Sequence, residues 1–240
     1  MRLDEIRLVE GIEDKGIFKA VFMSGMPGSG KTTVAKAVTD GTVSPRNVNT
    51  DDAFEFLSAK QGMEADSVAW SLVGQRSKKI TEERLYHYIN SMVPLFIDGT
   101  SGNIGAMVRR QGLLEGLGYD TMMVWVDVTL ETALERAAQR DRKVDEDYIR
   151  KIYAQIESSK QYYQHKFGNN FIVVDNNGDN LQKFVKTMYN RVNAFFTSPI
   201  SNPNGQNNIK KLKQAKEKYL VPTIVNEQFM KDLVKVWYLK

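Results

Sequence analysis

The sequence predicts an α/β protein in which helices cover both faces of a parallel sheet, with a short helical extension at the C-terminus. Two observations lead to this prediction. Short apolar runs alternate with stretches of helical periodicity, at intervals that leave room for a crossover helix between successive strands. The 240 residues are 42% hydrophobic and 26% charged, with 11 Phe, 10 Tyr and 3 Trp, which is enough apolar material for one sizeable core.

Five short runs are expected to form the strands, and the second of them is the least apolar. They are residues 17–23 (IFKAVFM), 46–49 (RNVN), 94–97 (PLFI), 121–128 (TMMVWVDV) and 170–174 (NFIVV).

Helical patterns fill the intervals between these runs. A helix over residues 31–40 is expected to end before Gly41, and residues 53–80 are expected to form a helical insertion. Thr81 is expected to cap a separate helix over residues 82–92. The remaining helices are expected between residues 98 and 120, over residues 130–142, from about residue 149 to Gly168, and over residues 181–195.

The chain is expected to divide into a domain over residues 1–196, a linker over 197–208 and a basic amphipathic helical tail over 209–240. The linker (TSPISNPNGQNN) holds two Pro, one Gly and four Asn. Residues 201–240 carry eight Lys against two Glu and one Asp, although the whole chain has a net charge of only +4. Such a tail can contact a phosphate backbone, dock onto a protein partner, or simply present a solvated helix face.

Several classes of protein are excluded by composition. The chain has no Cys, so it has no disulfide, thiolate zinc site or cysteine nucleophile, and two His are too few for a histidine-built metal site. No apolar run is long enough to span a bilayer, and the first ten residues lack the apolar core of a signal peptide, so export is not expected. We therefore expect a cytoplasmic protein without a membrane partner.

A phosphate-binding loop is predicted at residues 25–32 (GMPGSGKT), which fit the pattern G-x-x-x-x-G-K-[ST] between a predicted strand and a predicted helix. Its glycines let successive backbone N–H groups surround phosphate oxygens, and the helix N-terminus adds a partial positive charge. Lys31 is expected to reach the β- and γ-phosphates of ATP, and the Thr32 hydroxyl to hold Mg²⁺. The residues expected to bind ATP are Gly25, Met26, Pro27, Gly28, Ser29, Gly30, Lys31, Thr32 and Thr33.

Carboxylates follow the second and third predicted strands, at the edge of the sheet that carries the phosphate loop. Asp51 can accept the proton of an acceptor hydroxyl, whereas Asp52 is interpreted as a helix cap. Asp98 can bind the metal through water, position the acceptor, or only form an Asp-Gly turn.

Two arginines lie four residues apart on the predicted helix 130–142, so that Arg136 and Arg140 share one face and repel each other. A transferring phosphoryl group between them would satisfy both side chains, as in the lid of small kinases. The alternative is a solvated helix face.

These residues together resemble the polynucleotide kinase and zeta-toxin group of P-loop kinases, which is common in bacteriophages. The resemblance rests on MPGSGKTT followed by NVNTDD, on FIDGTSGN, and on LERAAQRDRK followed by VDEDYIRKIY, and it extends over residues 17–175. It implies a three-layer P-loop kinase fold with the strand order 2-3-1-4-5.

The resemblance also implies roles for single residues. Asp51 would be the general base, Lys31 and Arg140 would stabilise the transferring phosphoryl group, and Arg136 would assist. Polynucleotide kinases carry an arginine three residues after the base to hold the phosphate of the acceptor, and here that position is Phe54. The basic cluster formed by Arg76, Lys78 and Lys79 is a candidate replacement, with a solvated surface as the alternative.

We therefore predict an ATP- and Mg²⁺-dependent kinase that phosphorylates an acceptor hydroxyl. The acceptor is predicted to be DNA or RNA, at a 5′-hydroxyl end or a hydroxymethylated base. The alternatives are a nucleotide sugar or another small molecule, as for zeta toxins, and a nucleotide-binding interaction module without kinase activity. If a phage encodes the chain, we expect it in the host cytoplasm.

Overall fold

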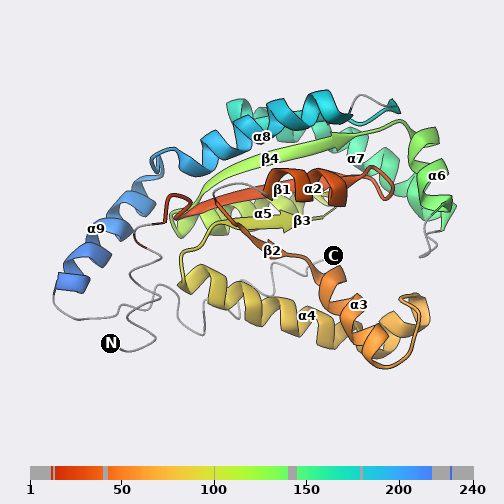
Figure 1. The fold of residues 1–240 in the computed structure, drawn as a ribbon, viewed down its shortest axis with the longest axis horizontal. Helices are drawn as coiled ribbons and strands as arrows, with labels where there is room; N and C mark the ends of the chain where they lie inside the picture. Colours follow the sequence, from red (N-terminus) through yellow and green to blue (C-terminus); the bar gives the residue numbers. More distant parts are fainter. Residues whose placement is uncertain are drawn as a thin grey trace.

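Five parallel strands form one sheet in the order β2-β3-β1-β4-β5; β2, β3, β1 and β4 follow one another in this order in Figure 1. The computed structural model describes residue 12 and residues 14–39, 43–99, 101–139, 145–178, 181–217 and 228. The predicted α/β class and strand order are confirmed. The strands are β1 (Lys19–Gly25), β2 (Arg46–Val48), β3 (Leu95–Asp98), β4 (Asp120–Asp127) and β5 (Phe171–Asp175).

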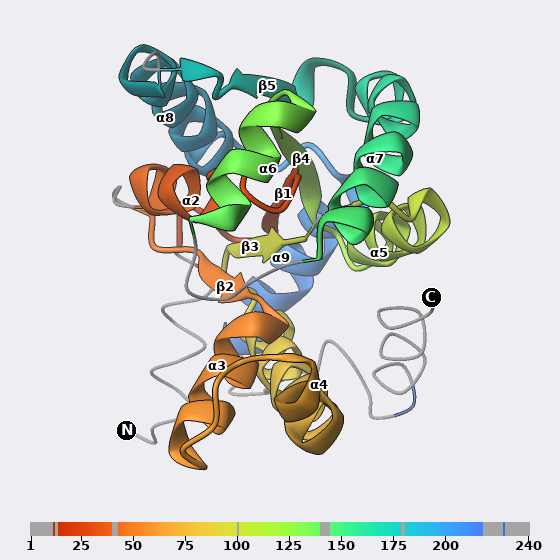
Figure 2. The same ribbon diagram turned by 90° about the vertical axis from the view of Figure 1, so that its right-hand side faces the viewer.

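Helices cover both faces of this sheet, as the two views in Figures 1 and 2 show. On one face, α2 (Lys31–Thr39) and α8 (Leu181–Thr197) cover an apolar cluster that includes Val21 and Val192. On the other face, α5 (Ile104–Gly116) and α7 (Glu146–Phe167) cover a larger cluster, in which the buried Trp125 lies against Tyr163. Within the described residues, no helix is long and apolar enough to cross a membrane.

A helical hairpin lies between β2 and β3, and here the predicted boundaries are wrong. It consists of α3 (Thr50–Lys60) and α4 (Ser67–Asn90), so the expected insertion and the expected helix 82–92 belong in part to one continuous helix. Asp66 caps α4, because its Oδ1 accepts a hydrogen bond of 2.8 Å from the Ala69 N–H. Thr81 lies inside α4, and its hydroxyl donates a hydrogen bond to the Ser77 carbonyl. The side chain is therefore bonded within the helix and does not cap the start of a new one.

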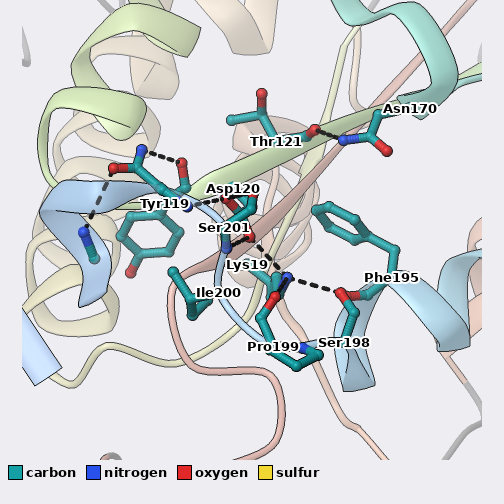
Figure 3. Close-up of polar contacts among 12 residues, drawn as sticks. Lys19, Tyr119, Asp120, Thr121, Asn170, Phe195, Ser198, Pro199, Ile200 and Ser201 are labelled. Atoms are coloured by element: carbon teal, nitrogen blue, oxygen red, sulfur yellow. Dashed lines mark hydrogen bonds and ion pairs between the residues drawn. The ribbon is translucent and has the colours of Figure 1, made fainter.

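The expected linker is in large part ordered against the sheet (Figure 3). The helix α9 (Pro203–Glu217) begins inside it, and the residues before α9 are held by the buried pair Lys19 and Asp120. Lys19 Nζ lies 2.8 Å from Asp120 Oδ2 and donates to Ser198 Oγ at 2.9 Å. Asp120 also accepts hydrogen bonds from the backbone N–H and the hydroxyl of Ser201. The tail beyond residue 217 lies outside the described residues, apart from residue 228.

The remaining helix, α6 (Leu130–Ala138), follows β4 and is shorter than the predicted helix 130–142. Residues 140–144 lie outside the described part of the chain, and they include Arg140.

The carboxyl ends of the central strands meet at one edge of the sheet. Gly25 of β1 is opposite Val126 of β4, and Met23 of β1 is opposite Asp98 of β3. Val48 of β2 pairs with Ile97 of β3. The loop after β1, the start of α3 and the end of β3 therefore converge there, which is where ligands bind in open parallel sheets.

Candidate functional site

The phosphate loop lies between β1 and α2, as predicted, and two of its glycines are required by their surroundings. Gly28 and Gly30 both have a φ of +86°, a left-handed conformation that other residues rarely adopt. A Cβ atom on Gly28 would meet the backbone carbonyl of Ala133 in α6, and one on Gly30 would meet the side-chain amide of Asn176. The loop is therefore enclosed by α6 on one side and by the segment after β5 on the other.

Lys31, the first residue of α2, lies over this loop. Its Nζ donates hydrogen bonds to the carbonyl oxygens of Gly25, at 2.8 Å, and Met26, at 2.9 Å. Thr32 and Thr33 follow on exposed positions in the first turn of α2, where backbone N–H groups remain free of helical partners. Together the ammonium group and the helix N-terminus form a cationic surface suited to phosphate.

Asn176 contacts the phosphate loop, and it was not identified from the sequence as a residue of the site. It directly follows β5 and is 4% exposed. Its Nδ2 donates to the Ser29 carbonyl at 2.7 Å, and its backbone N–H donates to the Asp127 carbonyl at 2.9 Å. The first contact joins residues 147 positions apart, and the second joins residues 49 positions apart (176 − 127), so no local pattern in the sequence could have indicated them.

The N-terminus of α3 carries both Asp51 and Asp52 on exposed positions. The interpretation of Asp52 as the helix cap is wrong: Asn49 is the N-cap, and its Oδ1 accepts a 2.8 Å hydrogen bond from the Asp51 N–H. Asp52 instead accepts a 2.8 Å hydrogen bond from the side chain of Asn47. Asn49 has the β-strand conformation that a cap requires, which releases Asp51 from a capping role.

Asp98 ends β3 beside these residues. Its Oδ2 accepts a hydrogen bond of 3.1 Å from Asn49 Nδ2, whereas its Oδ1 is buried and has no hydrogen-bond partner among the described residues. Burial raises the pKa of Asp98, the Lys31 ammonium opposes this shift, and the charges of Asp51 and Asp52 add to it. Lys31, Asp51 and Asp52 are therefore close enough to act electrostatically on Asp98.

A magnesium ion at this edge would depend on few protein ligands. Within the described ranges, no group of three or more His, Cys, Asp or Glu side chains could hold a metal ion. The Thr32 hydroxyl and the unpartnered Oδ1 of Asp98 fit a hydrated divalent cation whose other ligands come from bound phosphates.

Helices α6 and α7 close the site on the side of β4. Arg136 is half-buried on α6, whereas its expected partner Arg140 lies outside the described residues. On α7, Lys160 forms an ion pair with Asp127 at the end of β4. The Tyr163 hydroxyl, also on α7, donates to the Ser101 carbonyl at 2.7 Å and so holds the loop after β3, where Ser101 has a φ of +56°.

Phe54 cannot take the role of the arginine found at this position in polynucleotide kinases. It is fully buried, and its ring lies 4.9 Å from that of Trp70 on α4. Trp70 itself is 37% exposed, and the Lys78 ammonium lies 5.8 Å from its ring centroid. An aromatic ring and a cation are thus side by side on the surface of the α3–α4 hairpin.

Comparisons with known proteins identify a family and a relative of this chain. A family model described as an AAA domain, AAA_33, matches residues 21–165, which run from β1 into α7. A cytidylate kinase from Pyrobaculum neutrophilum is 25% identical over 160 residues, which are 62% of this chain and 74% of that protein.

Two solved structures are similar to the chain as a whole or in part. A chain of the AvrRxo1-ORF1:ORF2 complex has a TM-score of 0.54 and 15% identity, with 98% of this chain and 85% of that chain covered. A chain of the Pnkp1/Rnl/Hen1 RNA repair complex has a TM-score of 0.48 and 20% identity, with 60% and 45% covered. The first of these likenesses supports the fold.

Proposed function

Because the chain belongs to the AAA_33 family and is an ATP-dependent P-loop kinase, we propose that it transfers the γ-phosphoryl group of ATP to a hydroxyl of a nucleic acid. The observation that carries the proposal is that β1, β2 and β3 end at one edge of the sheet, which brings Lys31, Asp51 and Asp98 together there. A cation for the phosphates and a carboxylate for the acceptor proton are the two groups that such a transfer needs.

The reaction proceeds in this proposal by direct displacement at the γ-phosphorus. The acceptor hydroxyl gives its proton to the Asp51 carboxylate while its oxygen forms a bond to the γ-phosphorus. The bond from that phosphorus to the β–γ bridging oxygen breaks, and ADP leaves with the electron pair. Lys31 and Arg136, with Arg140, stabilise the charge that spreads over the phosphoryl oxygens. Mg²⁺ held by Thr32 and Asp98 would neutralise phosphate charge when bound.

The α3–α4 hairpin supports a nucleic acid as the acceptor. The partly exposed Trp70 ring beside the Lys78 ammonium, with the exposed Phe56, Arg76 and Lys79 on the same hairpin, combines stacking surfaces with positive charge. Proteins that bind single strands use this combination, because every base has a stacking face and every nucleotide a phosphate. The lysines of α9 do not line the site, since α9 lies at the opposite end of the sheet from α6 (Figure 1).

The burial of Phe54 favours a second candidate, a small-molecule acceptor such as a nucleotide sugar. In polynucleotide kinases, a cationic side chain three residues after the general base holds the phosphate of the acceptor. Here that position is the buried Phe54, which has no charge. Within the nucleic-acid proposal, the same observation favours a hydroxymethylated base over a 5′ end as the acceptor.

Transfer of γ-labelled phosphate to a panel of acceptors tests the proposal. The panel holds hydroxymethyluracil-containing DNA, unmodified DNA and RNA with 5′-hydroxyl ends, nucleosides and a UDP-sugar. We expect label in a nucleic acid, with most of it on the hydroxymethylated DNA. Label on the UDP-sugar or the nucleosides alone would replace the nucleic-acid proposal by the small-molecule one.

A further inference from the structure

One amide side chain links the ends of β2 and β3. Asn49 Oδ1 lies 2.8 Å from the Asp51 nitrogen, and Asn49 Nδ2 lies 3.1 Å from Asp98 Oδ2. The first contact is local, and the second spans 49 positions of the sequence. Asn49 therefore contacts both segments that supply carboxylates to the site.

The orientation of this amide is determined by its two partners. The Asp51 N–H is a donor and requires an acceptor, while the Asp98 carboxylate is an acceptor and requires a donor. With the amide turned over, an NH₂ group would face an N–H group and a carbonyl oxygen would face the carboxylate, so both contacts would be repulsive. Among short side chains, asparagine offers a donor and an acceptor on two separate atoms, whereas serine carries both on the one oxygen that caps the helix and an ionised aspartate has no donor.

We propose that Asn49 is a positioning residue for phosphoryl transfer, which fixes Asp98 against the start of α3 so that Asp98 and Asp51 keep one arrangement around the reacting groups. The part of this inference that concerns Asp51 rests on the proposed function. Because the amide occupies Oδ2 of Asp98, the buried Oδ1 is the oxygen left to face the reactants or a hydrated metal ion. Because the cap fixes the Asp51 backbone, the carboxylate of Asp51 starts from a defined position on the first turn of α3.

Asn49→Ser separates the two contacts of the side chain. Serine caps helices about as well as asparagine, so α3 should keep its start, but serine has no group that reaches Asp98 with a hydrogen bond. The matched control is Asn103→Ser. Asn103 caps α5 through an Oδ1 that lies 2.9 Å from the Ala106 nitrogen, and none of its hydrogen bonds within the described residues goes to a carboxylate.

The variants are compared in three assays. These are phosphoryl transfer to the acceptor that takes label, hydrolysis of ATP, in which water is the acceptor, and thermal unfolding. We expect Asn49→Ser to lower kcat about tenfold or more in both reactions, the usual effect of losing a hydrogen bond to a charged group, with the KM for ATP unchanged. Asn103→Ser should match the wild type in kcat, and the two serine variants should unfold at similar temperatures. Equal kcat values for Asn49→Ser and Asn103→Ser would overturn the inference.

A double-mutant cycle tests whether Asn49 acts through Asp98. If it does, Asn49→Ser should cost little once Asp98 is replaced by alanine, which has no acceptor for the Asn49 amide, so the double variant should be about as slow as Asp98→Ala alone. Independent, multiplicative losses would contradict the inference. ATP hydrolysis uses water in place of the acceptor substrate, so these outcomes can be measured even if that substrate is not a nucleic acid.

Discussion

Replacing Gly28 with alanine tests whether α6 shapes the phosphate loop. Gly28 has a φ of +86°, and a Cβ atom there would lie against the backbone carbonyl of Ala133 in α6. Gly62, in the turn after α3, has a φ of +68° and nothing within 4 Å of the same atom. Gly62→Ala is therefore a control that carries the conformational strain without the steric contact.

The expected magnitudes follow from this difference. Each substitution should lower the free energy of unfolding by about 1–2 kcal/mol, the cost of a left-handed conformation for a residue with a Cβ atom. In Gly28→Ala the loop must also move away from α6, because the carbonyl belongs to the helix backbone and has little freedom to yield. A displacement of about 1 Å at a reacting phosphate costs about 100-fold in rate, so we expect this loss in transfer for Gly28→Ala alone.

Calorimetric titration measures the affinity for ATP, chemical unfolding measures the free energy of unfolding, and a transfer assay measures the rate of phosphoryl transfer. We expect ATP affinity to fall about tenfold in Gly28→Ala, which corresponds to about 1.4 kcal/mol, and to stay at the wild-type value in Gly62→Ala. If Gly28→Ala binds ATP and transfers phosphate as well as Gly62→Ala does, the loop does not depend on its contact with α6.

Three further predictions concern the buried pair Lys19 and Asp120, Arg136 on α6, and Asn176 beside the phosphate loop. Asp120→Ala should lower the free energy of unfolding by about 3–5 kcal/mol in urea titrations, because it leaves the buried Lys19 ammonium unpaired. Burial alone would raise the pKa of Asp120, but hydrogen bonds from Lys19 and Ser201 hold it below its ordinary value. The wild-type protein should therefore keep this stabilisation above a pH of about 4 and lose it as the pH falls through the lowered pKa, a loss that Asp120→Ala should not show. Arg136→Ala should slow transfer by about 10–100-fold with ATP affinity nearly unchanged, as measured in single-turnover reactions. Asn176→Asp should weaken ATP binding about tenfold, because a carboxylate cannot donate to the loop and repels phosphate.

Local patterns were sufficient to predict the elements that position the site. The apolar run over residues 17–23 and the glycine-rich motif after it indicated β1 and the phosphate loop, because burial on both faces and a tight phosphate loop each leave a local signature. Boundaries were less predictable. Both Asp66 and Thr81 can cap a helix, and only the packing of α4 as one helix decides that Thr81 lies inside it.

Contacts between distant parts of the chain could not be predicted from the sequence. Asn49 and Asn176 bond to partners far along the chain, and an asparagine in a loop does not reveal its partner. The contacts of the expected linker could not be predicted for the same reason: its Pro, Gly and Asn content is typical of a linker, but Asp120 supplies acceptors for its backbone and for the Ser201 hydroxyl. Those acceptors lie more than 80 positions away.

Single-turnover transfer of γ-labelled phosphate by the wild type, Asp51→Asn and Asp52→Asn tests directly whether Asp51 is the general base. The two aspartates are neighbours on α3 and both are exposed, so the variants differ chiefly in which carboxylate is lost. We expect all three proteins to bind ATP equally and Asp51→Asn alone to lose transfer, by about 100-fold or more. Retention of transfer in Asp51→Asn, or an equal loss in Asp52→Asn, would contradict the assignment of Asp51 as the base that accepts the proton of the acceptor hydroxyl.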